Sequence, residues 1–273
     1  MKTKDFLVSG ESFDLVFDAE QEMLVTFPTP KSEDLSKYYE SDAYISHTDS
    51  DSGMLASIYQ WVKKYSLSKK LKLITSLQKG AGSLLDIGAG TGDFLKLAKV
   101  HNWEVSGVEP NPGARALAKE KRIELEWSID DCSGKQFDVV TLWHVLEHMP
   151  DLETTLKKIE ALVKPGGHLI IAVPNYNSFD AKYYKEFWAA FDVPRHLWHF
   201  SRNSMKQLFS EQFHLRKTKP MIFDSFYVSL LSEKYKTRST FSIRAFFIGL
   251  WSNIKAMGTK EYSSLIYCFK KEI

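Results

Sequence analysis

Short apolar runs alternate with longer helical patterns through the middle of the chain. The apolar runs predict buried strands at residues 84–87, 104–108, 137–144 and 169–175, because a central parallel strand is buried on both faces. Apolar residues at helical spacing between residues 55 and 77 predict a long helix before the first strand. Strands and helices in this order indicate an α/β fold with a largely parallel sheet.

The two ends of the chain carry different patterns. Polar and apolar residues alternate over residues 5–27 and predict a hairpin. We therefore expect a hairpin and lid segment over residues 1–54 and one catalytic domain over residues 55–273. Within that domain we expect a helical insertion at about residues 224–258. The other predicted elements are a short helix at 32–39, a further strand at 214–220 and a last strand at 264–269.

Three alternating glycines, Gly88, Gly90 and Gly92, follow the first predicted strand and precede a helix. Glycine allows a positive φ and lets a ligand lie against the backbone, while the free N–H groups of the next helix point to the same place. The junction therefore predicts a small cofactor. An NAD-dependent oxidoreductase would need the spacing G-x-G-x-x-G, but Phe94 and Leu95 occupy the region of its third glycine.

Glu109 ends the second strand, about twenty residues beyond Gly88. A carboxylate at this offset can accept hydrogen bonds from both hydroxyls of a ribose. Asn111 and Pro112 then predict the cap and first turn of a helix.

The run from Leu85 to Gly92 resembles the first motif of class I S-adenosylmethionine-dependent methyltransferases, (hydrophobic)-D-(hydrophobic)-G-x-G-x-G. The segments HVLEH at 144–148, KPGG at 164–167 and VPN at 173–175 extend the resemblance, which spans residues 83–175 and points to the ubiquinone-biosynthesis-like group. It implies a Rossmann-like, doubly wound, seven-stranded sheet, mostly parallel with an antiparallel last strand, and helices on both faces. It also implies S-adenosylmethionine as cofactor and S-adenosylhomocysteine as product.

The resemblance implies where that cofactor is held. The glycine loop would lie beside its amino acid moiety, and an acidic loop would meet the adenine amino group through Asp130, with Asp131 as the alternative. Tyr39, Tyr44 and His47 lie in a segment rich in aromatic residues. This segment either forms a lid over the cofactor or attaches the N-terminal helix to the domain. The expected cofactor contacts are Asp86, Gly88, Ala89, Gly90, Gly92, Glu109, Pro110, Ile129, Asp130, Trp143, Tyr39, Tyr44 and His47.

Methyl transfer from a sulfonium mainly requires alignment and exclusion of water, although an alcohol acceptor benefits from a base. His144 ends the predicted strand at residues 137–144, at the edge where open α/β sheets bind ligands, so it is a candidate base or a hydrogen-bond partner. His196 and His199 are alternatives in a later loop rich in aromatic residues, at residues 187–201, which we call the aromatic loop. Arg195 could bind a carboxylate or phosphate of the acceptor, or hold the loop by bonding carbonyls.

His144, Glu147 and His148 also have ligand-like spacing if they lie on a helix. Ubiquinone-biosynthesis methyltransferases carry an acidic residue at the position of His144, and a hard cation such as magnesium prefers oxygen ligands. We therefore expect no bound metal and expect Glu147 and His148 to order the turn. The N-terminal hairpin lacks the cysteine pairs of the zinc ribbon that some relatives carry there.

Composition narrows the function further. The 36 basic and 34 acidic side chains leave a formal charge of +2, which disfavours a nucleic acid substrate. The two cysteines, Cys132 and Cys268, and the polar N-terminus suggest a reducing cytoplasm. The apolar run at residues 245–251 is shorter than the roughly 20 residues of a membrane helix. Core packing or a dimer contact is favoured for it over a membrane surface or a lipidic substrate.

Together these patterns predict a cytoplasmic methyltransferase that acts on a small molecule, with oxygen as the expected target. The alternative is a cofactor-binding but non-catalytic module that serves assembly. A homodimer through the C-terminal aromatic insertion is the expected protein contact.

Overall fold

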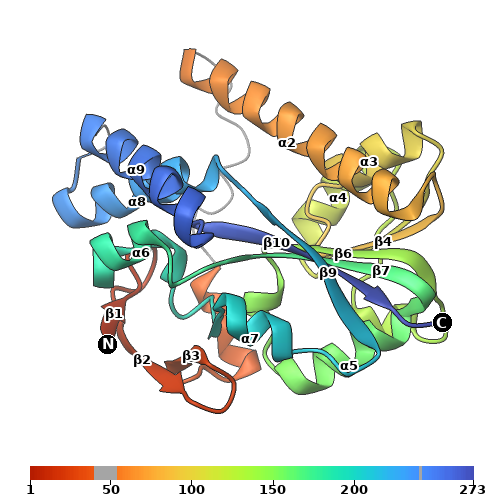
Figure 1. Ribbon diagram of the computed structural model, residues 1–273, viewed down its shortest axis with the longest axis horizontal. Helices are drawn as coiled ribbons and strands as arrows, with labels where there is room; N and C mark the ends of the chain where they lie inside the picture. The colour runs from red at the N-terminus through yellow and green to blue at the C-terminus, as the bar shows by residue number, and fades with distance from the viewer. Residues whose placement is uncertain (40–53, 240–241) are drawn as a thin grey trace.

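The computed structural model describes residues 1–39, 54–239 and 242–273, and its centre is a six-stranded sheet (Figure 1). β5, β4, β6 and β7 pair in parallel, and β10 runs antiparallel to both of its neighbours. The predicted Rossmann-like α/β fold is therefore confirmed. The strands, in order across the sheet, are β5 (Glu104–Val108), β4 (Ser83–Ile87), β6 (Phe137–Trp143), β7 (Val163–Pro174), β10 (Ser264–Lys271) and β9 (Phe213–Pro220).

The seventh strand that the resemblance implied is not formed by the described residues. At the outer edge of β5, Glu126 makes one isolated parallel bridge with Val108. Backbone hydrogen bonds from Glu109 and to Gly107 hold this segment, but they do not continue along the chain. Ser128 then caps the short helix η2 (Ile129–Cys132), which turns the chain away from the sheet. The expectation of seven strands is wrong by one.

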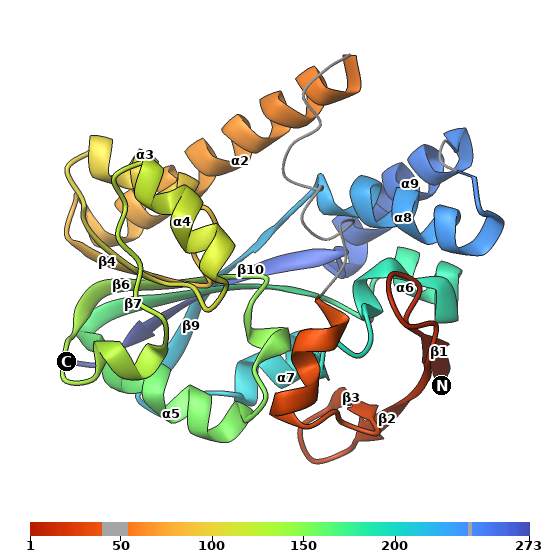
Figure 2. The ribbon, with the colours of Figure 1, turned by 180° about the vertical axis from the view of Figure 1, so that it is seen from behind.

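Helices cover both faces of the sheet (Figures 1 and 2). α2 (Met54–Gln78), α3 (Asp93–Val100) and α4 (Pro112–Glu120) lie on one face, and α5 (Leu152–Leu162) and α7 (Arg202–Gln207) lie on the other. A hydrophobic core lies on each face of the sheet. Successive residues of a strand contribute to opposite cores because their side chains alternate in direction. In β4, Leu84 packs with α2 and α3, whereas Leu85 packs with α5.

The predicted N-terminal hairpin is present as β2 (Ser12–Asp18) and β3 (Met23–Phe27). It belongs to a second sheet, completed by β1 (Lys2–Lys4) and by β8 (Trp198–His199) from the aromatic loop. The sequence did not indicate this pairing. A third core joins the hairpin and η1 (Ser32–Tyr38) to α6 (Phe179–Tyr184) and η5 (Ala189–Phe191).

The C-terminal insertion forms two adjoining helices, α8 (Asp224–Thr237) and α9 (Ile243–Thr259) (Figure 1). α9 turns its small residues Ala245, Gly249, Ser252 and Ala256 inward. None of the described helices is both long enough and apolar enough to cross a bilayer. The core-packing interpretation is wrong for the large apolar residues of α9, which are exposed: Ile243, Phe246, Phe247, Leu250, Trp251, Ile254 and Met257.

Candidate active site

The glycine loop lies at the carboxyl end of β4, the edge at which open α/β sheets bind ligands. Gly88, Gly90 and Gly92 have φ angles of 72°, 55° and 73°, a region that disfavours other residues. A Cβ on Gly88 would stand 2.4 Å from Val145, so that glycine is required by packing. A Cβ on Gly90 would meet nothing within 4 Å. The backbone of Gly90 is therefore open to a ligand.

Glu109 is held against the same loop. Its Oε2 accepts a hydrogen bond from the Gly90 N–H at 2.8 Å, and its Oε1 accepts one from the Asn111 N–H at 2.9 Å. Arg115 donates to the carbonyls of Glu109 and Pro110 at 2.6 and 2.8 Å. The carboxylate is thus fixed at the end of β5, and a carboxylate oxygen with one partner still has a lone pair for another donor.

Asp86 and Trp143 are buried or half-buried beneath this edge. Burial raises the pKa of Asp86 to about 7, although the hydroxyl of Thr141, 2.5 Å away, and the charge of Lys70 oppose this. The ammonium of Lys70 lies 4.3 Å from the ring centroid of Trp143. The sequence did not indicate Lys70, because it is one of several lysines in α2 and nothing local distinguishes it from those on the surface.

The residues expected at the adenine already have partners within the protein. Asp130 is exposed and forms an ion pair with Lys158 at 2.6 Å. Asp131 accepts a hydrogen bond from the Ser128 N–H at 2.9 Å and completes the cap of η2. Ile129 packs against the core beside α5. Ala89 is half-buried in the glycine loop, and Pro110 is exposed after Glu109.

Only part of the expected lid can be placed. The hydroxyl of Tyr39 lies 3.1 Å from Nδ1 of His148, in the turn after β6. Tyr44 and His47 lie outside the described residues.

His144 follows β6 with a φ of 58° and lies between two carboxylates. Its Nε2 is 3.1 Å from Asp224 at the start of α8, and its Nδ1 is 3.4 Å from Glu147. Partial burial opposes the charged form, but Asp224 and Glu147 together raise the pKa of His144 to about 10. A protonated imidazole cannot take a second proton, so this arrangement does not fit the expectation that His144 is itself the base. Asp224 was missed because only the packing of α8 brings it here.

Arg195 is 1% exposed, and its donors are used inside the protein. Its guanidinium contacts Asp5 at 2.9 Å and Asp192 at 2.7 Å, and Nη1 donates to the Tyr38 carbonyl at 2.9 Å. These contacts tie the N-terminal segment to the aromatic loop. Of the two roles expected for Arg195, these contacts match the one in which it holds the loop.

His196 and His199 are also buried. Nδ1 of His196 is 2.9 Å from the Ala190 carbonyl, and Nε2 of His199 is 2.9 Å from the Thr26 hydroxyl. Burial holds the pKa of His199 well below its usual value. Neither histidine is exposed to an acceptor, so their expected catalytic role is corrected.

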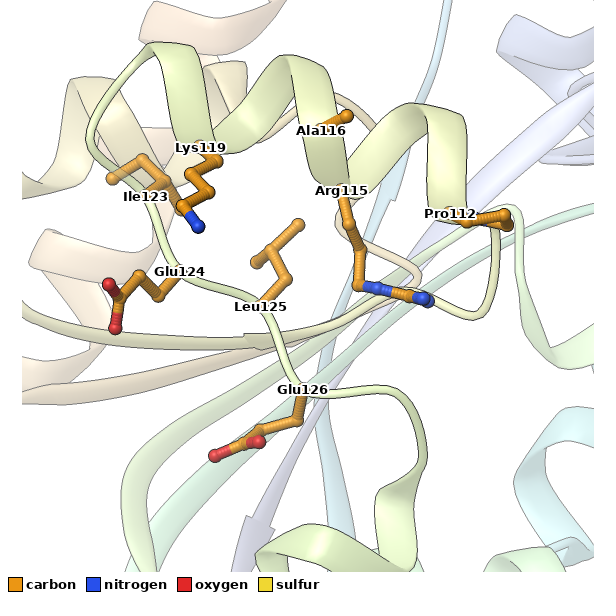
Figure 3. A pocket seen from close by; sticks show the side chains of 8 residues that line it. All are labelled: Pro112, Arg115, Ala116, Lys119, Ile123, Glu124, Leu125 and Glu126. Atoms are coloured by element: carbon orange, nitrogen blue, oxygen red, sulfur yellow. The ribbon is translucent and has the colours of Figure 1, made fainter.

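A separate hollow of about 460 Å³ lies between α4 and the segment at residues 123–126 (Figure 3). Arg115, Lys119, Glu124 and Glu126 give it a mixed charged lining. It includes neither the glycine loop nor the carboxylate of Glu109. We therefore do not place the cofactor in this hollow.

Comparisons with curated proteins find methyltransferases with similar sequences. A ubiquinone biosynthesis O-methyltransferase from Coxiella burnetii is 30% identical over 103 residues, covering 34% of this chain and 44% of the relative. One from Yersinia pestis is 31% identical over 122 residues, covering 40% and 50%. The chain thus spans about half the length of the curated relatives it matches.

Solved structures share the fold. A 1,6-didemethyltoxoflavin-N1-methyltransferase from Burkholderia thailandensis has a TM-score of 0.56 at 15% identity, with 99% of this chain and 100% of that chain covered. A putative sarcosine dimethylglycine methyltransferase from Galdieria sulphuraria has a TM-score of 0.51 at 15% identity, covering 77% and 85%. At such identities the likeness concerns the fold alone.

The model of the methyltransferase domain family matches residues 59–216, which is more than half of the chain. This range begins in α2 and ends within β9, so it includes the glycine loop, Glu109 and His144. The resemblance inferred from the motifs is confirmed, and the chain belongs to the methyltransferase domain family, within the class I S-adenosylmethionine-dependent methyltransferases.

Proposed function

We propose that this chain uses S-adenosylmethionine to methylate a small molecule at oxygen. The observation that carries the proposal is the open backbone of Gly90 beside the fixed carboxylate of Glu109, both at the carboxyl edge of a Rossmann-like sheet. The family match supports methyl transfer, and the names of the curated relatives favour oxygen as the target. Because the glycine loop and Glu109 are both present at this edge, we disfavour the alternative of a non-catalytic module.

We assign the cofactor contacts as follows. The first turn of α3, next to the glycine loop, holds the amino acid moiety, because the N–H groups at a helix N-terminus bind carboxylates. Glu109 accepts the ribose hydroxyls through its remaining lone pairs. Trp143 and Asp86 lie beneath the bound cofactor, and the loop at Asp130 contacts its adenine.

The acceptor reacts on the side of His144 and Asp224. Its oxygen attacks the methyl carbon, the carbon–sulfur bond breaks, and the sulfur leaves as neutral S-adenosylhomocysteine. The proton of the hydroxyl passes to the carboxylate of Asp224, which is partly exposed. Protonated His144 orients this carboxylate through their 3.1 Å contact. Asp224 is therefore the proposed base and His144 its positioning residue.

Two measurements test this function. Calorimetric titration with S-adenosylhomocysteine should show one site per chain, and labelled S-adenosylmethionine should methylate a component of a fractionated metabolite extract. Absence of binding at high protein concentration contradicts the proposal. Binding without transfer to any fraction supports the non-catalytic alternative instead.

Asp224→Asn is expected to lower kcat for the labelled acceptor by about 10-fold or more, because an amide cannot accept the proton. It should leave the affinity for S-adenosylhomocysteine unchanged and should lower the pKa of His144, which can be measured by NMR titration. Asp14→Asn, on the N-terminal sheet, is the control and should retain full activity. An Asp224→Asn enzyme with normal kcat removes the assignment of the base.

We also propose a homodimer through α9, in a cytoplasmic protein whose cysteines Cys132 and Cys268 are buried and unpaired. The exposed apolar residues of α9 recur at helical spacing and form one stripe. A stripe of this kind on a soluble protein marks an interaction surface.

Light scattering with size-exclusion chromatography is expected to give the mass of a dimer for the natural chain. The double variant Phe247→Glu, Trp251→Glu should be a monomer, because each copy would bring buried, unpaired charges to the interface. Val100→Glu, at an exposed apolar position on α3, is the control. A natural chain that is monomeric at tens of micromolar rules out this dimer.

A further inference from the structure

Three side chains to which the proposed methyl transfer assigns no role lie close together near His144, where the turn after β6 meets the aromatic loop. Glu147, His148 and His196 each offer one ligand atom, and these atoms lie within 4.8 Å of one another. Glu147 and His148 belong to η3 (Leu146–His148), and His196 comes from the aromatic loop. The Leu197 N–H donates to the Glu147 carbonyl at 2.8 Å, so the turn and the loop are joined at this point.

The backbone orients both imidazoles in the same way. Nδ1 of His148 is 3.1 Å from the Arg195 carbonyl, and Nδ1 of His196 is 2.9 Å from the Ala190 carbonyl. A carbonyl oxygen can only accept, and the Tyr39 hydroxyl 3.1 Å from Nδ1 of His148 can accept as well, so each Nδ1 carries the proton and each Nε2 keeps a lone pair. Nε2 of His196 is 4.0 Å from Asp192, which is beyond hydrogen-bond distance. Histidines that bind metals commonly donate their other N–H to a backbone carbonyl in this manner.

Glu147 supplies the second, independent observation. The residue is 1% exposed, and both of its carboxylate oxygens are buried without a hydrogen bond among the described residues. Among the described residues it forms an ion pair with His144, with 3.4 Å between Nδ1 and Oε1. A buried carboxylate without hydrogen bonds is costly. A metal cation between Glu147 and the two imidazoles would satisfy it.

We propose that Glu147, His148 and His196 bind one divalent first-row transition metal of the zinc class. Two imidazole nitrogens and one carboxylate oxygen form a known three-ligand set for such metals. Magnesium is disfavoured because it prefers oxygen ligands. The bound ion would join the turn after β6 to the aromatic loop. The inference does not depend on the methyltransferase function.

The sequence spacing suggested a different set, namely His144 with Glu147 and His148. The fold turns His144 toward Asp224 and brings His196 to the cluster instead. The earlier expectation of no metal weighed only the three residues of that one segment. His196 lies 48 positions beyond His148 and could not be joined to them by spacing.

The test uses the untagged full chain, dialysed against a chelator and then against buffer. Calorimetric titration with zinc chloride should show one site with a dissociation constant below about 1 µM, while magnesium chloride should give no heat. Co²⁺ should give a visible absorption band that zinc displaces. His196→Ala and Glu147→Gln should each weaken zinc binding by more than about 100-fold, since even outer-shell changes cost 10–100-fold.

His214→Ala, at a histidine paired with Glu272 on the surface, is the control and should bind zinc as the natural chain does. Circular dichroism and the retained affinity for S-adenosylhomocysteine show that each variant is folded. Should His196→Ala fail to fold, Glu147→Gln and the Co²⁺ band of the natural chain decide the question. Absence of a one-to-one zinc site in the natural chain, or a folded Glu147→Gln variant with undiminished affinity, overturns the proposal.

Discussion

Glu109→Ala is expected to weaken the binding of S-adenosylhomocysteine by more than about 100-fold, a loss that exceeds roughly 2.7 kcal/mol. Each hydrogen bond from a ribose hydroxyl to a carboxylate contributes about 1.5–3 kcal/mol, and the variant removes two of them. It also removes the acceptor for the Gly90 N–H, which lies 2.8 Å from Oε2 in the natural chain. Isothermal titration calorimetry measures the effect directly.

Glu126→Ala is the matched control for this prediction. Glu126 lies near Glu109 in the fold, and its backbone bonds to Glu109 and Gly107, but its side chain is exposed. Its replacement should change the affinity by less than about twofold. If Glu109→Ala binds as tightly as the natural chain while remaining folded, the ribose assignment is wrong and the cofactor lies elsewhere.

Arg195→Ala is expected to lower the free energy of unfolding by about 3–5 kcal/mol, because it leaves buried carboxylates without their partner. Asp5 is 1% exposed and contacts the guanidinium at 2.9 Å, and Asp192 contacts it at 2.7 Å. For a chain of this size the melting temperature should fall by roughly 6–15 °C. Thermal and urea unfolding followed by circular dichroism measure both quantities.

Arg202→Ala serves as the control for Arg195. Arg202 pairs with Glu261 at 3.3 Å, but the pair is partly exposed, and such pairs contribute at most about 1 kcal/mol. Arg195→Lys should also be destabilised, since an ammonium cannot reproduce the planar contacts to two carboxylates and a carbonyl. A loss below about 1 kcal/mol in Arg195→Ala would show that the N-terminal segment is held by its apolar contacts alone.

Local sequence predicted the cofactor edge because its signals lie close together in the chain. A buried strand, a glycine loop and a helix follow one another from residue 83 to residue 100, and Glu109 ends the next strand. Patterns of apolar residues likewise predicted α2, β6 and the last two strands of the chain, β9 and β10. The family resemblance implied one strand too many, since the segment at residues 123–126 pairs with β5 at a single bridge.

The acceptor side could not be predicted in the same way. Arg195, His196 and His199 occur in one short polar and aromatic run, which suggested contact with a substrate. Their burial depends on pairing with Asp5, Ala190 and Thr26, and two of these partners come from the other end of the chain.

The amino-acid sequence by itself determined the family, the α/β sheet and the edge at which a cofactor is expected, because each depends on periodicity or spacing over a few tens of residues. Tertiary structure decided which side chains face one another: Asp224 with His144, Arg195 with Asp5, and His196 with Glu147 and His148. Except for the neighbours Glu147 and His148, these contacts join residues that are separated by 48 to 190 positions in the chain. Packing of whole helices and sheets creates them, and no local pattern encodes such packing.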